Sequence, residues 1–335
     1  MPYTKELEKL YKAFRVGGIE CKANHPMAEH TSFHIGGNAA LCVWPAGRGQ
    51  LVQVLSLWRE LGGKCPICVL GKASNVLFPD NGYRGLVVIT TRAKRVVFEE
   101  DIVPDREAFR ASNVFCQVYA ECGAPIMGLA AACWDVSRGL SGLEFAYGIP
   151  GTVGGATVMN AGAFGSEMER ILISAEYYDL SNGRVVRLSD HEMELQYRHS
   201  IFLDHPEWIV LSSVMKLSYG NAEDIRNQSK HNLESRDAKQ PHREPCAGSV
   251  FKRPVNDFAG RMVENVGLKG VSVGGAQVSE KHAGFIVNKG GATAADVIAL
   301  VRLVRDAVEE VYHYRLECEI RLVSDGLDPN EETEW

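Results

Sequence analysis

The chain has 335 residues, of which 45% are hydrophobic and 23% charged, and its formal net charge is −6. This length allows two or three domains with a sizeable buried core, and the composition is that of an ordinary soluble globular protein. The charge balance excludes a global positive field that would attract nucleic acid or an anionic membrane, and no apolar run is long enough to span a bilayer. We therefore expect neither nucleic acid nor a membrane as a partner.

Cysteine usage and the N-terminus favour the cytoplasm. The nine cysteines are scattered through apolar segments, and the first fourteen residues are charged and amphipathic, without the apolar core of a signal peptide. Cys65 and Cys68 have CxxC spacing, but no second pair exists and a strand-like stretch follows them. We expect structural thiols there, and no pattern argues for a disulfide or a metal site.

The elements expected in chain order mix helices and strands without a regular repeat, which favours the α+β class. Helical periodicity predicts helices over 4–15, 50–61, 124–137, 221–238 and 293–313, the last opening with Thr293 and Asp296 in capping-box spacing. Strands are predicted at 68–70, 86–90, 114–120, 174–180, 184–189, 208–218, 284–288 and 316–324. The segment "SNGR" at 181–184 predicts a hairpin turn, and a domain boundary is expected near 215–240.

Three glycine-rich segments carry few charges: "SFHIGGNA" (32–39), "LGKASNVLFPDNGYRG" (70–85) and "GIPGTVGGATVMNAG" (148–162). Glycine permits positive φ and lets backbone amides line a concave surface, as wrapping a pyrophosphate with few cations requires. The spacing matches neither the GxGxxG fingerprint nor a Walker motif. On spacing alone, ordinary turns and a nucleotide cradle both remain open.

Blocks in a fixed order carry a family resemblance: "TSFHIGG", "GKASNVLF", "GLEFAYGIPGTVGGATVMNAGAFG", "QYRHSIF", "AGSVFKRP", "GGAQVSEKHAGFIVN" and "LECEIRLVS". From about residue 24 to 323 the chain resembles UDP-N-acetylenolpyruvoylglucosamine reductases. The resemblance implies an FAD-binding region of the vanillyl-alcohol-oxidase (PCMH) type in two subdomains, 1–95 and 96–215. A C-terminal α+β substrate domain at 216–323 and an acidic tail at 324–335, expected to be disordered, follow. The short segment before "AGSVFKRP" implies the compact type, without an extra tyrosine-bearing loop.

The reaction that this resemblance implies belongs to peptidoglycan precursor synthesis. NADPH gives a hydride to FAD, and the reduced flavin then reduces the enolpyruvyl group of UDP-N-acetylglucosamine enolpyruvate to give UDP-N-acetylmuramate. Negative charge builds up on the substrate, so a cation and a proton donor are needed. The alternatives are another flavin oxidase or dehydrogenase of this fold, or a non-catalytic nucleotide-binding module. We expect a monomer.

Three residues are assigned to the chemistry on this resemblance. Ser249 in "AGSVFKRP" would donate the proton, although a serine after glycine is usually a turn hydroxyl. Arg198 in "YRHSIF" would bind the substrate carboxylate through its planar fork, where an ordinary arginine would form a surface ion pair. Glu319 in "LECEIRLV" would bind the carboxylate or orient the arginine, although alternation alone places it on a solvated strand face.

The binding residues are assigned in the same way. The backbone around nine residues would cradle FAD: Gly71, Ser74, Asn75, Gly148, Ile149, Gly151, Thr152, Gly155 and Asn160. Candidates for the UDP moiety are Lys239, Lys252, Arg253, Lys281 and His282. The chain departs from the family pattern at Ala73, where a glycine is usual, at Cys318, where a proline is common, and at Arg253, where some members have asparagine. Because alanine tolerates positive φ poorly, the turn at Ala73 is uncertain.

Overall fold

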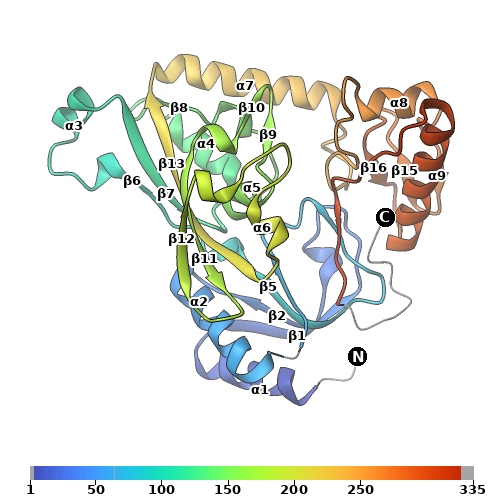
Figure 1. Cartoon of the computed structure of the whole chain (residues 1–335), viewed down its shortest axis with the longest axis horizontal. Helices are drawn as coiled ribbons and strands as arrows, with labels where there is room; N and C mark the ends of the chain where they lie inside the picture. The colour runs from blue at the N-terminus through green and yellow to red at the C-terminus, as the bar shows by residue number, and fades with distance from the viewer. Residues whose placement is uncertain (1–3, 64, 326–335) are drawn as a thin grey trace.

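A computed structural model describes residues 4–63 and 65–325 of the chain. Its N-terminal part is a four-stranded sheet in the order β1-β2-β5-β3, in which β2, β5 and β3 are parallel and β1 is antiparallel to β2. Helices α1 and α2 pack beside this sheet, at the bottom of Figure 1. The bounds are α1 Lys5–Val16, β1 Glu20–Pro26, β2 Asn38–Trp44, α2 Arg48–Leu57, β3 Ile67–Leu70, β4 Val76–Leu77 and β5 Tyr83–Ile89.

The middle of the chain forms an antiparallel sheet in the order β12-β11-β13-β7-β6, with β8 paired to β13. One hydrophobic core joins this sheet to α1, α2 and the first sheet, so the two sheets fold as one packed body. Helix α3 projects from its edge (Figure 1). The bounds are β6 Val96–Phe98, α3 Arg106–Ser112, β7 Phe115–Glu121, α4 Ile126–Cys133, β8 Leu140–Ser141, α5 Val153–Val158, β9 Gly162–Ala163, β10 Ser166–Glu167, β11 Leu172–Asp179, β12 Val185–Ser189, α6 Ile201–Asp204 and β13 Trp208–Tyr219.

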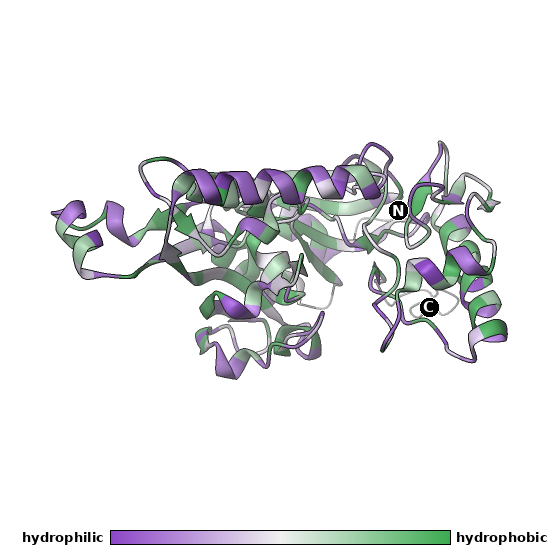
Figure 2. Cartoon of the chain, turned by 90° about the horizontal axis from the view of Figure 1, so that it is seen from above, coloured by the Kyte–Doolittle hydropathy of each residue, from purple (hydrophilic) through white to green (hydrophobic). Residues whose placement is uncertain are grey.

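The long helix α7 crosses the top of the molecule and leads to a C-terminal part with its own core (Figure 1). The helix is polar along most of its length (Figure 2), and it buries only a few side chains. The chain then returns to the N-terminal part, where β17 pairs in parallel with β4. The bounds are α7 Ala222–Lys239, α8 Ala259–Asn265, β14 Ser272–Val273, β15 Ala276–Val278, β16 Ile286–Asn288, α9 Ala294–Tyr312 and β17 Arg321–Leu322.

Most predicted elements are present, and the α+β class is confirmed. All five predicted helices form, α9 begins with the expected capping box at Thr293, and "SNGR" joins the antiparallel strands β11 and β12. The seven-residue strands β1 and β2 and several strands of two or three residues were not predicted. The strand predicted at 316–324 is largely wrong, because only Arg321–Leu322 is regular strand and Cys318 makes an isolated bridge with Phe251.

The structure also tests the predictions made for the cysteines and for the start of the acidic tail. All nine thiols are free, Cys65 is buried, and burial raises the pKa of Cys68 to about 12, as expected for structural thiols. Asp325 is buried and forms a two-pronged ion pair with Arg84, so the predicted disorder does not hold at the start of the tail. Residues 326–335 lie outside the described residues. Among those that are described, none of the helices has the length and apolar character that crossing a membrane requires.

Candidate active site

Arg198 lies on a tight turn that projects from the middle part of the chain. Gln196 and His199 exchange two backbone hydrogen bonds across this turn, and Arg198 itself has a φ of 55°. Positive φ at the third residue is the geometry of a type II turn, which usually takes glycine or asparagine there. An arginine therefore occupies this position at a conformational cost, which indicates that its side chain is needed where the turn aims it.

A buried ion pair joins Arg198 to Glu319, which lies 121 residues later in the sequence. Arg198 Nε donates to Glu319 Oε1 over 2.7 Å, and Arg198 Nη2 donates to the carbonyl of Gly162 over 2.9 Å. The two side chains are only 18% and 16% exposed. Burial raises the pKa of Glu319, against the opposing effect of Arg198. The solvated strand face that alternation suggested for Glu319 is therefore wrong.

Ser249 belongs to a short ladder beside Glu319. It forms an isolated antiparallel bridge with Phe285, and the amide of Glu319 donates to the carbonyl of the next residue, Val250, over 2.8 Å. The Ser249 hydroxyl donates to the carbonyl of Phe251 over 3.1 Å. The structure thus brings the segments of all three predicted catalytic residues to one place where the middle and C-terminal parts meet.

The two glycine-rich loops predicted to cradle FAD lie against each other. A Cβ on Gly71 would overlap the hydroxyl of Thr152, and a Cβ on Gly151 would lie 3.9 Å from Ser74 Oγ. Thr152 is buried and caps α5 by accepting from the amide of Gly155. Only glycine permits such close approach at residue 71, so these loops form one continuous backbone surface. Gly148, with a φ of 101°, and Ile149 lead into it.

A cavity of about 310 Å³ opens beside this surface, lined by Gly71, Lys72 and Pro150 with residues 29–32, Ile89 and Thr91. Ala73, at the turn left uncertain by the sequence, has a φ of 47°. The alanine adopts a left-handed conformation that glycine usually takes, and its methyl group is buried in a core with Leu70 and Phe78. The cavity and the close loop contact fit a bound dinucleotide.

The side chains of Asn160 and Asn75 form hydrogen bonds with backbone groups of the protein. Asn160, fully buried with a φ of 41°, donates through Nδ2 to the carbonyl of Gln196 and accepts through Oδ1 from the amide of Glu169, each over 2.8 Å. Asn75 Nδ2 donates to the carbonyl of Glu319 over 3.2 Å. The Asn160 side chain therefore holds the turn that carries Arg198, and Asn75 holds the backbone of Glu319.

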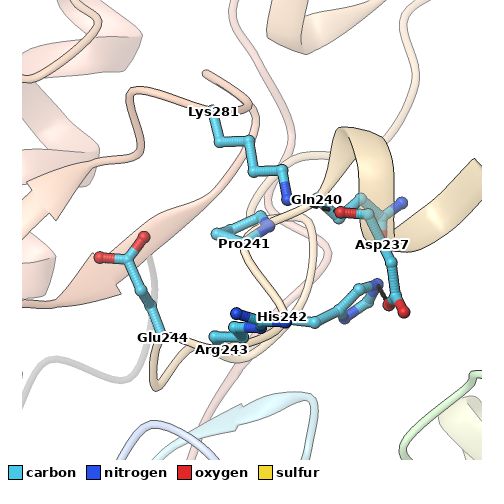
Figure 3. A pocket seen from close by; sticks show the side chains of 7 residues that line it. All are labelled: Asp237, Gln240, Pro241, His242, Arg243, Glu244 and Lys281. Atoms are coloured by element: carbon cyan, nitrogen blue, oxygen red, sulfur yellow. Dashed lines mark hydrogen bonds and ion pairs between the residues drawn. The ribbon is translucent and has the colours of Figure 1, made fainter.

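The candidate UDP cations separate into two groups. Lys281 reaches toward the end of α7 and donates to the carbonyl of Asp237 over 2.5 Å, beside a cavity of about 390 Å³ (Figure 3). Exposed Lys239 ends the same helix. Lys252 pairs with Glu317 over 3.2 Å, while the backbone amide of Arg253 donates to the hydroxyl of Tyr197 on the Arg198 turn.

The imidazole of His282 forms its contacts within its own loop. Its Nδ1 accepts from the amide of Gly284 over 3.1 Å, its ring packs on Phe285, and burial lowers its pKa. These contacts shape the loop that pairs with Ser249. Substrate binding by His282 stays a prediction for which its geometry offers little support.

Arg236 on α7 was missed by the sequence analysis. Its Nε is buried without a hydrogen-bond partner among the residues that the structure describes, and a Cβ on Gly148 would lie 3.2 Å from its Cδ. Burial, and then the nearby charge of Arg198, lower its pKa. Two arginines this close favour an anion between them. No signal in the sequence of α7 separates Arg236 from the other charged residues of a solvated helix.

Comparisons with known proteins agree with this geometry. Residues 39–189 match the FAD binding domain family, and residues 240–323 match the C-terminal domain family of UDP-N-acetylenolpyruvoylglucosamine reductase. The reductase of Caldanaerobacter subterraneus subsp. tengcongensis is 40% identical over 95% of this chain and 98% of its own, and that of Rubrobacter xylanophilus is 42% identical over 91% and 95%. The solved reductase of Thermus caldophilus aligns with a TM-score of 0.69 at 29% identity, covering 91% of this chain and 98% of its own.

Fold and site together define an FAD-binding oxidoreductase with a separate C-terminal domain. The chain belongs to the UDP-N-acetylenolpyruvoylglucosamine reductase family. This membership favours the reductase over the two alternatives raised from the sequence.

Proposed function

We propose that the protein catalyses the NADPH-dependent reduction of UDP-N-acetylglucosamine enolpyruvate to UDP-N-acetylmuramate, with FAD as its resident cofactor. The observation that carries this proposal is the buried Arg198–Glu319 pair beside the Ser249 ladder. An FAD enzyme acting on another substrate would need the glycine-rich loops but not this constellation.

Bound FAD would supply hydride transfer between NADPH and the substrate double bond. The backbone of Gly71–Asn75 and of Gly148–Gly155 would hold it, with amides in place of cations at the pyrophosphate. The close contact of Gly71 with Thr152 supports this role, because it brings the two loops together beside the cavity that Gly71 and Pro150 line.

Arg198 would bind the carboxylate of the substrate and draw negative charge onto it as hydride arrives. Two of its five N–H groups are used by Glu319 and by the carbonyl of Gly162, which fix the plane of the guanidinium. The remaining N–H groups can form a two-pronged contact with a carboxylate. Glu319 would act mainly by holding Arg198 through the ion pair, although burial raises the pKa of its carboxyl.

Ser249 would give its hydroxyl proton to the substrate carbon next to the carboxylate. In the structure this hydroxyl donates to the carbonyl of Phe251, so a small rotation about the Cα–Cβ bond has to release it toward the substrate. The ladder with Phe285 and Glu319 keeps the backbone of Ser249 fixed during this movement. Serine is a weak acid, but a carbon that bears developing negative charge is a strong base.

The UDP moiety would lie toward α7 and the C-terminal part. Arg236, with its unpartnered Nε, is the best placed cation for a phosphate. Lys281 lines the cavity at the end of α7, and Lys239 is the last residue of that helix. We also propose that the protein works as a monomer in the cytoplasm. Its site is built from one chain, and its free thiols suit a reducing compartment.

The test starts from purified protein reconstituted with FAD, whose visible absorption should bleach with NADPH and return on anaerobic addition of the enolpyruvyl substrate. Ser249→Ala should keep FAD and its reduction by NADPH but lose about 10²–10⁴-fold in turnover, the usual contribution of a general acid. Ser272→Ala serves as the matched control, because Ser272 is the exposed first residue of β14. Normal turnover by Ser249→Ala would refute the assignment of the acid, and a protein that cannot take up FAD would refute the function.

A further inference from the structure

Two histidines and a glutamate converge at the end of β1, beside the cavity of about 310 Å³ described above. His25 lies near the end of β1, and Glu29 and His30 lie at the end of the single 3₁₀ turn Met27–Glu29 that follows. The Nε2 atoms of His25 and His30 are 2.7 Å apart. One ligand atom from each of the three side chains lies within 4.8 Å of the others, and no other such group occurs within residues 4–63 and 65–325.

Contacts of Met27 hold the turn that carries this group in place. Met27 is fully buried and packs against Cys42 of β2, with its sulfur 3.6 Å from the thiol. The amide of His30 donates to the carbonyl of Met27 over 2.8 Å, which closes the turn. The buried ring of Trp44 contacts both imidazoles, with centroids 5.2 Å and 5.6 Å away. The two rings therefore face each other on a fixed base.

The spacing suits a small metal ion. Two nitrogens bound at about 2.0–2.1 Å in tetrahedral geometry lie about 3.3 Å apart, so the rings need to separate by only about 0.6 Å. Glu29 is exposed, and its flexible side chain can bring the carboxylate to the ion. Two imidazoles and one carboxylate form the ligand set of zinc sites that keep a fourth position open.

The group borders a cavity. Glu29 and His30 line the cavity of about 310 Å³ that Gly71 and Pro150 also line. We propose that His25, Glu29 and His30 bind one divalent first-row transition-metal ion, with Zn²⁺ as the probe of choice, and that its fourth coordination position opens toward this cavity. Water, or a polar group of a molecule held in the cavity, completes the coordination.

The experiment is a calorimetric titration of tag-free, FAD-loaded protein with Zn²⁺ after treatment with a chelator. The wild type should bind one equivalent. His30→Asn should lose at least about 100-fold in affinity, because even residues that only support a ligand contribute about 10–100-fold. Glu29→Gln should lose about tenfold, and His191→Asn, whose side chain is 95% exposed and remote in sequence, should bind as the wild type does.

Two results would overturn the proposal. One is the absence of a stoichiometric site in the wild type, and the other is equal affinity in the wild type and in both His30→Asn and Glu29→Gln, which would assign the heat to thiols or other groups. Thermal unfolding of the metal-free variants shows whether each is folded. If His30→Asn does not fold, the exposed Glu29→Gln still decides the question. Metal binding is read directly, so the outcome is independent of reductase turnover.

Discussion

Asn160 makes a sharp test of how the site is held, because its side chain joins the loop "NAG" to the turn that carries Arg198. We consider Asn160→Ala. The substitution removes the donor to the carbonyl of Gln196 and the acceptor for the amide of Glu169, both at 2.8 Å and in a fully buried place. It also forces alanine to adopt a φ of 41°, which asparagine tolerates better.

The magnitude follows from these three losses. The amide of Glu169 is left without its buried partner, which costs about 1–3 kcal/mol. The carbonyl of Gln196 keeps the amide of His199, so the lost bond to it costs about 0.5–1.5 kcal/mol, and the left-handed conformation adds about 1 kcal/mol. We expect the free energy of unfolding of Asn160→Ala to fall by about 4 kcal/mol. Because the turn then moves relative to the substrate, kcat should fall by about 10²-fold, as a misplacement of about 1 Å can cost. FAD should stay bound, and its reduction by NADPH should continue.

The assay is urea unfolding of FAD-loaded protein, combined with steady-state kinetics. The control is Asn24→Ala, because Asn24 has a similar φ of 48° but is exposed and lies outside the site. This control should lose about 1 kcal/mol, with kcat unchanged. If Asn160→Ala loses no more stability than Asn24→Ala, or if it keeps full kcat, then Asn160 does not hold the turn and the reasoning is refuted.

Three further predictions concern Glu319, Gly71 and Arg236. The pKa of Glu319 is raised in the folded protein, so the stability that it contributes is present below the unfolded value and is lost as pH rises through the folded one. The wild type should therefore lose stability relative to Glu319→Gln as pH rises above about 4.5, measured as the difference in Tm across that range; a constant difference would contradict the raised pKa. Gly71→Ala should weaken FAD binding measurably and destabilise the protein by about 1–3 kcal/mol, whereas Gly49→Ala, with no atom within 4 Å of its added Cβ, should do neither. Arg236→Met should keep or raise the stability of substrate-free protein and raise KM for the UDP substrate by about 10–100-fold; an unchanged KM would show that no phosphate lies there.

Local patterns predicted the elements whose stability is local. Helix α9 combines a long amphipathic period with a capping box, and both signals lie within its own sequence. Strand β1 escaped prediction because "ECKANHP" is polar, ends in proline and has one face covered only in part. Strand β2 is buried on nearly every residue, and this removes the alternation by which a strand with one exposed face is recognised.

The catalytic candidates could be named by resemblance, but their connections could not. The contact between Arg198 and Glu319 spans 121 residues, and that between Asn75 and Glu319 spans 244. Spacing within one sequence carries no information on such distant pairs. Arg236 was missed for a related reason: its environment is created by Gly148 and Arg198, which come from other parts of the chain.

The position of Asn75 connects cofactor binding with the catalytic pair. Its backbone belongs to the loop "GKASN", while its side chain donates to the carbonyl of Glu319 and its own carbonyl accepts from the amide of Arg321. The next residues, Val76 and Leu77, pair with β17 and continue the same connection. Backbone contacts therefore join this loop to Glu319, and the ion pair joins Glu319 to Arg198. The loop that would receive the cofactor thus also sets the position of the group that would receive the substrate carboxylate.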